Sequence, residues 1–155
     1  MTRRVLERIR VTFSRALRER CEEAGCQCRR DHLPAHVILN GDELRRDRQM
    51  PDCIFFLGTD AITIAVVELK GRNADAGEVA NKLTNGAILA LEILRDAGYA
   101  GGPPLCFHIL LTQAWRSASE FAILRRTKLR IDGTRYDIIA KKCGYSLLEI
   151  VGAFN

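Results

Sequence analysis

Residues 51–71, PDCIFFLGTDAITIAVVELKG, contain two apolar runs separated by a Gly-Thr-Asp stretch at 58–60. Both runs are rich in β-branched and aromatic residues, so the pattern predicts a β-hairpin. In the second run both alternating sets of side chains are apolar as far as Val67. A strand of this kind is covered on both faces, and residues 62–70 are therefore expected to form a central strand.

The flanking sequence supplies elements that would cover such a strand. Apolar residues recur at helical spacing from Val5 to Ala24 and predict one helix of five turns that Gly25 ends. A short strand is expected at 35–40, closed by an Asn-Gly turn and followed by a polar loop at 42–50. After the hairpin, the pattern predicts a helix at 78–95 and a buried strand at 105–112. A helical crossover would make that last strand parallel to one of the hairpin strands.

The remaining residues predict a C-terminal extension. A short helix is expected at 117–126, a hairpin of 129–131 with 136–140, and a final strand at 146–151. We predict one α/β domain over residues 1–155, with an α-β-β-β-α-β core at about 1–112 and an extension at about 113–155. The central sheet should be mixed and flanked by helices.

Composition excludes several classes of protein. The chain has 155 residues, 47% hydrophobic and 28% charged, and no apolar run approaches the roughly 20 residues that span a bilayer. The first 20 residues have neither a continuous apolar stretch nor a small-residue cleavage site, so we expect no secretory signal, no membrane contact and a cytoplasmic location. Because the cytoplasm is reducing, the six cysteines are expected to be reduced thiols, with Cys53 and Cys106 as small buried hydrophobic residues.

The basic charge is dominated by arginine. The net charge is +5, and 19 of the 24 basic residues are arginines, whose planar fork suits phosphate oxygens. Residues 1–30 hold nine arginines against four glutamates, and Arg45, Arg46 and Arg48 form a second cluster. Both groups favour contact with nucleic acid, although a solvated helix face and a polar loop explain them equally well.

Charged residues interrupt the apolar hairpin at one end. Glu68 and Lys70 lie two positions apart and share a face, and Asp52 falls opposite Glu68 if the turn is centred on Asp60. Two carboxylates about 4 Å apart repel by roughly 4 kcal/mol at an effective dielectric near 20. A hard divalent cation such as Mg²⁺ or Mn²⁺, bound by Asp52 and Glu68, would offset this cost. The alternative is that these charges are solvated or paired with Arg72.

Pro51-Asp52 followed by Glu68-Leu69-Lys70 on a buried strand resembles the PD-(D/E)XK nuclease superfamily. That superfamily includes restriction endonucleases, Holliday-junction resolvases and repair exonucleases, and its core has the element order predicted for residues 1–112. The resemblance implies a restriction-endonuclease-like fold, with Asp52 and Glu68 as metal ligands and Lys70 as the catalytic lysine. It also suggests an additional acid from the first helix and a glutamine or lysine on the helix after the motif. The candidates in this chain are Glu19, Glu22 or Glu23, and Lys82.

The expected function is therefore divalent-metal-dependent hydrolysis of phosphodiester bonds, most simply by an endonuclease acting on DNA, with RNA not excluded. The expected contacts to the nucleic acid are Arg45, Arg46, Arg48, Arg72 and Lys82. Because a chain this small offers limited surface for gripping a duplex, we expect a homodimer or a subunit of a larger complex. The alternative is a nucleic-acid-binding or assembly module on a catalytically degenerate nuclease scaffold.

Other residues suggest weaker hypotheses. Cys26, Cys28, His32 and His36 could bind zinc, although the Cys-x-Cys start is tight, and with Cys21 the thiols could hold an iron–sulfur cluster. His108 is expected to be a hydrogen-bonded core histidine. Trp115 is expected to pack under the C-terminal extension, or to stack on a base.

Overall fold

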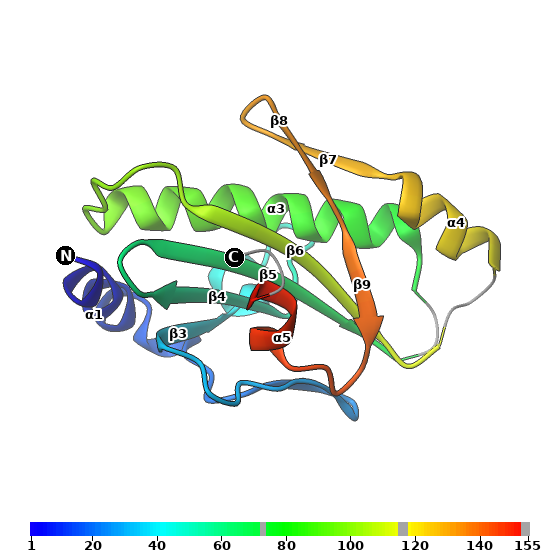
Figure 1. Cartoon of the computed structure of the whole chain (residues 1–155), viewed down its shortest axis with the longest axis horizontal. Helices are drawn as coiled ribbons and strands as arrows, with labels where there is room; N and C mark the ends of the chain where they lie inside the picture. The colour runs from blue at the N-terminus through cyan, green and yellow to red at the C-terminus, as the bar shows by residue number, and fades with distance from the viewer. Residues whose placement is uncertain (72–73, 115–117, 153–155) are drawn as a thin grey trace.

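A computed structural model describes residues 1–71, 74–114 and 118–152. It is a mixed α/β structure with a five-stranded mixed sheet of order β3-β4-β5-β6-β9, flanked by helices (Figure 1). The strands of this sheet are β3 (Ala35–Asn40), β4 (Cys53–Gly58), β5 (Ile62–Lys70), β6 (Leu105–Thr112) and β9 (Ile139–Lys142).

The hairpin of β4 and β5 has the predicted register. Cys53 pairs with Val67 and Gly58 with Ile62, so the residue numbers of each pair sum to 120. The same register places Asp52 opposite Glu68, at the end of the hairpin away from its turn. The residues of β5 from Ile64 to Leu69 are buried, which confirms a central strand covered on both faces.

One face of the sheet is covered by α3 (Ala76–Asp96), which runs along the strands in Figure 1. Asp75 caps this helix by accepting a hydrogen bond of 3.0 Å from the backbone N–H of Glu78. Val79, Leu83 and Ala87 form the apolar stripe that α3 packs against the sheet. The crossover makes β6 parallel to β5, as predicted.

The predicted first helix is too long. Helix α1 (Thr2–Thr12) is followed by a 3-10 turn, η1 (Ser14–Ala16), and then by a hairpin of β1 (Cys21–Glu23) and β2 (Cys26–Cys28). The turn of this hairpin has positive φ at Ala24 and Gly25. Cys21, Cys26 and Cys28 are buried on the face of the sheet opposite α3. Burial at this distant surface overrides the local helical spacing.

The C-terminal extension agrees with the sequence only in part. Helix α4 (Ala118–Arg126) is confirmed, and a hairpin is present, formed by β7 (Lys128–Ile131) and β8 (Thr134–Asp137). Its second strand begins and ends earlier than the predicted 136–140. The chain then turns into β9, which adds to the main sheet parallel to β6. The expected last strand is instead α5 (Leu147–Gly152), whose buried Leu147, Ile150 and Val151 have helical spacing. A short helix not predicted from the sequence, α2 (Gly41–Leu44), starts the polar loop.

The cysteines are not all reduced thiols, and this expectation was wrong. Disulfides join Cys21 to Cys53 and Cys26 to Cys143 across sequence separations of 32 and 117 residues, while Cys28 and Cys106 are free. The zinc hypothesis loses Cys26 as a ligand. Within the described ranges, no group of three or more His, Cys, Asp or Glu residues is placed to hold a metal ion.

None of the helices in the described part of the chain has the length and apolar character needed to cross a membrane.

Candidate active site

The structure brings together two carboxyl groups at the end of the central hairpin. Asp52 precedes β4 and Glu68 is near the end of β5, and the backbone N–H of Asp52 donates to Glu68 Oε1 at 3.2 Å. Leu69 fixes the other carboxyl group, because its backbone N–H donates to Asp52 Oδ2 at 2.8 Å. Glu68 is 1% exposed, whereas Asp52 is only partly buried. The register predicted from the sequence therefore produces the expected convergence.

Two lysines neutralise the buried carboxylate. Lys70 Nζ lies 3.3 Å from Glu68 Oε2, and Lys82 Nζ lies 3.1 Å from the same oxygen. Lys82 comes from α3, at a point where the helix approaches the sheet closely. A Cβ at Gly86 would meet Pro51 Cγ at 2.5 Å and Val66 Cγ1 at 2.8 Å. Glycine thus allows the helix to pack tightly one turn from Lys82, which brings this lysine over Glu68.

Glu78 completes the cluster and was not predicted from the sequence. Its Oε1 lies 3.0 Å from Lys70 Nζ and 3.1 Å from Lys82 Nζ, so each lysine bridges Glu68 and Glu78. The only signal in the sequence is the spacing of Glu78 and Lys82, four positions apart on one helix, which is common on solvated helices. We define the charged cluster as Asp52, Glu68, Lys70, Glu78 and Lys82.

Electrostatics within the charged cluster shift the pKa values of Asp52 and Glu78 in opposite directions. Burial raises the pKa of Asp52 to about 7, and the hydrogen bond and repulsion with Glu68 act in the same direction. Hydrogen bonds from Lys70 and Lys82 hold the pKa of Glu78 below its usual range. Burial alone would lower the pKa of Lys82, but the charge of Glu68 and the bonds to both glutamates outweigh burial and raise it. Lys82 is therefore a fixed cation, and Asp52 is the group that exchanges a proton near neutral pH.

Replacement of Asp52 by asparagine should stabilise the metal-free protein at alkaline pH. The pKa of Asp52 is raised in the folded state, so the folded protein keeps a proton that the unfolded chain releases between about pH 4 and 7. Ionisation of Asp52 therefore lowers stability as the pH rises through this window. The rise in the pKa of Asp52 from its ordinary value to about 7 corresponds to about 4 kcal/mol. Because Asp52 is partly exposed, the expected gain in the free energy of unfolding of Asp52→Asn is about 2 kcal/mol.

This gain is measured by urea unfolding in chelator. Asp52→Asn should be more stable than wild type at pH 8 and no more stable at pH 4. Asp96→Asn, at the exposed end of α3, serves as the control and should change neither value. An Asp52→Asn protein less stable than wild type at pH 8 would contradict this account of the site.

The donor set suits one kind of metal. Asp52 and Glu68 supply carboxylate oxygens and no thiol or imidazole joins them among the described residues, which disfavours zinc. Mg²⁺ keeps several waters and is commonly held by one or two carboxylates together with substrate phosphates. With Asp52 ionised, the charged cluster has three negative and two positive groups, so a divalent cation would leave it at +1, the charge that matches one phosphodiester.

The other predicted site residues lie outside the charged cluster. Arg45, Arg46 and Arg48 are exposed in the loop after α2, where Arg46 pairs with Glu43 at 3.0 Å. Gly41, which begins α2, donates its N–H to the backbone oxygen of Asp52 at 3.4 Å, so this loop starts beside the site. Arg72 and Trp115 lie outside the described residues.

The expected acid from the first helix is absent from that helix. Glu19 and the β1 residues Glu22 and Glu23 follow α1, and in the structure as described none of them contacts Asp52 or Glu68. Glu23 pairs instead with Arg18 at 3.5 Å. Arg18 in turn donates to the backbone oxygen of Asp52 at 3.3 Å, so this region supplies a guanidinium beside the site and no third carboxylate.

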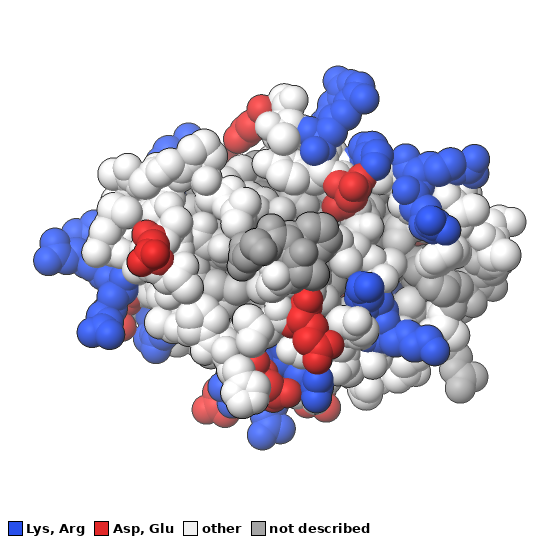
Figure 2. Space-filling model, viewed as in Figure 1, with Lys and Arg blue, Asp and Glu red and all other residues white. Residues whose placement is uncertain are grey.

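Strand β9 adds lysines that the sequence did not associate with the site. Lys70 pairs with Thr112 and Thr112 with Lys142, so the three residues lie side by side at one end of the sheet. Lys141 and Lys142 are exposed. Figure 2 shows lysine and arginine side chains gathered over β9 and α4. The C-terminal extension therefore places positive charge at the same end of the sheet as the charged cluster.

His108 is buried on β6, away from the charged cluster, and is 1% exposed. Both ring nitrogens lack a hydrogen-bond partner in the described structure, so the expectation of a hydrogen-bonded core histidine was wrong. Burial lowers the pKa of His108 to about 4, and the neutral ring packs against Tyr136 with centroids 4.8 Å apart.

The arrangement at the sheet end therefore supports binding of a hard cation and of a phosphate beside it. Comparison with known proteins adds no assignment, since no family model, no curated protein and no solved structure matches this chain.

Proposed function

We propose that this protein is a divalent-metal-dependent nuclease that hydrolyses phosphodiester bonds of DNA, with a restriction-endonuclease-like core of the PD-(D/E)XK type. The observation that carries the proposal is the convergence of Asp52 and Glu68, whose carboxylate accepts the backbone N–H of Asp52 at 3.2 Å, beside the ammonium group of Lys70. The antiparallel strands β3, β4 and β5, the crossover α3 and the parallel strand β6 also have the order that this fold requires.

Each group of the charged cluster has a chemical role in this proposal. Asp52 and Glu68 would hold Mg²⁺ or Mn²⁺, which supplies polarisation of the phosphodiester and stabilisation of the leaving oxygen. Lys70, next to Glu68, orients the attacking water or neutralises charge on the phosphoryl group. Lys82 adds a second fixed positive charge, and Glu78 holds both ammonium groups in place. The lysines are thus positioned before the substrate arrives, which lowers the reorganisation that the reaction requires.

The charge of the surrounding surface favours a nucleic acid as substrate. Lys141 and Lys142 lie at the same sheet end as Lys70, and the loop that carries Arg45, Arg46 and Arg48 starts beside Asp52. Such exposed cations neutralise backbone phosphates without reading sequence. We further propose that the protein acts as a homodimer or as a subunit of a larger complex, since either would enlarge this surface. A monomeric mass in solution with full activity would contradict that part of the proposal.

A panel of substrates tests the activity. Wild-type protein is incubated with linear, circular, single-stranded and junction DNA and with RNA, in Mg²⁺, Mn²⁺ or chelator. We expect cleavage of at least one DNA in Mg²⁺ or Mn²⁺ and none in chelator. Cleavage that persists in chelator, or cleavage of no substrate in either metal, would contradict the proposal.

A second candidate is a nucleic-acid-binding or assembly module on a degenerate nuclease scaffold. It is favoured by the burial of Glu68 and by its pairing with two lysines, since a closed ion-pair network can be purely structural. Its signature in the same panel would be salt-sensitive DNA binding without metal-dependent cleavage. Retention of no nucleic acid at low salt would leave only the assembly role.

A further inference from the structure

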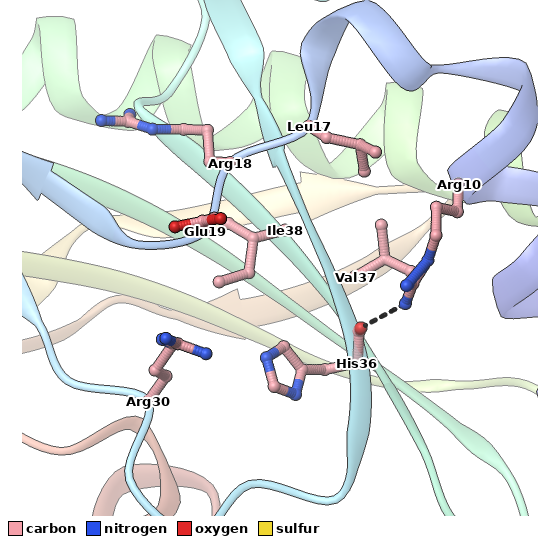
Figure 3. Close-up of a pocket in the computed structure, with 8 residues that line it drawn as sticks. All are labelled: Arg10, Leu17, Arg18, Glu19, Arg30, His36, Val37 and Ile38. Carbon is pink, nitrogen blue, oxygen red and sulfur yellow. Dashed lines mark hydrogen bonds between the residues drawn. The ribbon is translucent and has the colours of Figure 1, made fainter.

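A polar pocket of about 500 Å³ lies at the outer edge of β3, apart from the charged cluster. Figure 3 shows the residues that line it. They come from α1, from the segment between η1 and β1, from the chain after β2, and from β3 itself. Three of them are arginines, Arg10, Arg18 and Arg30, against one acid, Glu19. The pocket is therefore a concentration of positive charge on an edge strand.

The edge of β3 directs polar backbone groups toward this pocket. Arg10 Nη2 donates to the carbonyl oxygen of His36 at 3.1 Å, and the backbone N–H of Arg18 donates to the carbonyl oxygen of Ile38 at 2.9 Å. In an antiparallel ladder the N–H and C=O of one residue point to the same side. The N–H groups of His36 and Ile38 thus also face outward, as potential donors to an anion.

His36 is held in one orientation and one tautomer. Its Nδ1 lies 2.8 Å from the carbonyl oxygen of Pro34. Because a carbonyl can only accept, Nδ1 carries the hydrogen in this contact. Nε2 is then the ring atom left for a ligand, as an acceptor from a protonated phosphate or, when the ring is cationic, as a donor.

Arg30 is the guanidinium most available to a ligand. It is exposed, and its side chain makes no hydrogen bond or ion pair with another described residue. Figure 3 shows its guanidinium group and the ring of His36 pointing toward one another. Arg18 differs, because its guanidinium group leaves the pocket for the backbone oxygens of Asp52 and Glu22. Besides its hydrogen bond to the His36 carbonyl oxygen, Arg10 has an exposed ion pair of 3.9 Å with Glu7, which solvent largely screens.

We propose that this pocket binds a backbone phosphate of a DNA strand, through Arg30, Arg10 and His36. The identity of the polymer rests on the proposed nuclease function, whereas the anion site rests on the pocket. His36 pairs with Leu57, five positions along β4 from Asp52. At about 3.3 Å per residue this is roughly 17 Å, the length of about five nucleotides of one B-form strand. The pocket would hold the strand at this distance from the candidate site.

The experiment measures DNA binding without cleavage. Wild type, Arg30→Ala and Arg95→Ala bind a labelled 20-base-pair duplex in chelator, over a series of salt concentrations. Arg30→Ala should weaken binding about tenfold and reduce the slope of log affinity against log salt by about 0.9, the value for one lost phosphate contact. Arg95 is exposed near the far end of α3, so Arg95→Ala makes the same charge change outside the pocket and should have less than a twofold effect.

A second measurement uses inorganic phosphate and follows the ring signals of His36 by NMR. Phosphate should shift these signals in wild type and Arg95→Ala and shift them less in Arg30→Ala. Equal DNA binding by Arg30→Ala and Arg95→Ala would overturn the proposal. If phosphate still shifted the His36 signals in that case, the pocket would be assigned to a small phosphorylated ligand instead of DNA. If wild type cleaves no DNA while Arg30→Ala still weakens binding, the pocket assignment stands and the nuclease function fails.

Discussion

Purified Glu68→Gln protein should lose at least about 10³-fold of the DNA cleavage rate in Mg²⁺, because loss of a metal-binding carboxylate removes several kcal/mol of transition-state stabilisation. The substitution keeps the size of the side chain and its capacity to accept the N–H of Asp52, so folding should survive. It also frees Lys70 and Lys82 from one of their two carboxylates. The measurement is the initial rate on the preferred substrate of the panel, with unfolding followed in parallel.

The matched control is Glu92→Gln, which makes the same chemical change on α3 outside the charged cluster. It should cleave within about twofold of wild type, since it contributes no group to the site. DNA binding in chelator should be similar for Glu68→Gln and wild type, because the expected defect is in the reaction. Cleavage by Glu68→Gln at the wild-type rate would leave the charged cluster a structural network and would overturn the proposed active site.

Reduction of the two disulfides should produce the largest loss of stability. In the chain-entropy model, a link across 117 residues restricts the unfolded chain by about 5 kcal/mol, and one across 32 residues by about 4 kcal/mol. Cys26–Cys143 ties β2 to the chain that follows β9, and Cys21–Cys53 ties β1 to the residue after Asp52. We expect Cys26→Ser with Cys143→Ser to lower the free energy of unfolding by several kcal/mol.

Urea unfolding with and without a reductant measures this effect, and thiol titration in denaturant counts the free cysteines. Two reactive thiols per chain are expected, from Cys28 and Cys106. Cys106→Ser, which removes a free thiol, is the control and should respond to reductant as wild type does. Six reactive thiols in protein purified without reductant, or an unfolding midpoint that reductant does not move, would contradict the pairing.

These disulfides also bear on where the protein works. Disulfides persist in oxidising compartments and are rare in the cytoplasm of most organisms. The reduced thiols expected from the sequence took the cytoplasmic location as their premise, and four of the six cysteines do not meet that expectation. The thiol titration therefore tests this premise together with the structure.

The central strands could be predicted from the sequence because their signals are local. Apolar runs of the right length, a turn at 58–60 and the constant residue sum of a hairpin are enough to place Asp52 opposite Glu68. The crossover helix and the parallel β6 follow from helical periodicity and the rule for such connections. These elements position three residues of the charged cluster.

The rest of the charged cluster depends on how α3 lies across the sheet. Lys82 was identified as a candidate from the resemblance, and Glu78 was not identified at all. Glu78 and Lys82 resemble an ordinary solvated ion pair on a helix until Gly86 allows the helix to approach Pro51 and Val66. Only that close approach converts the pair into a bridge between Lys70 and Glu68.

The sequence by itself determined the hairpin, its register and the meeting of Asp52 with Glu68, because short-range periodicity fixes which side chains share a face. Only the tertiary structure decided that residues 21–28 form a hairpin and not a helix, that β9 joins the main sheet, and which carboxylates pair with Lys70 and Lys82. In each of these cases the favourable burial or charge pairing is with residues far along the chain. Local propensity does not contain that free energy, so the pattern of the sequence cannot reveal it.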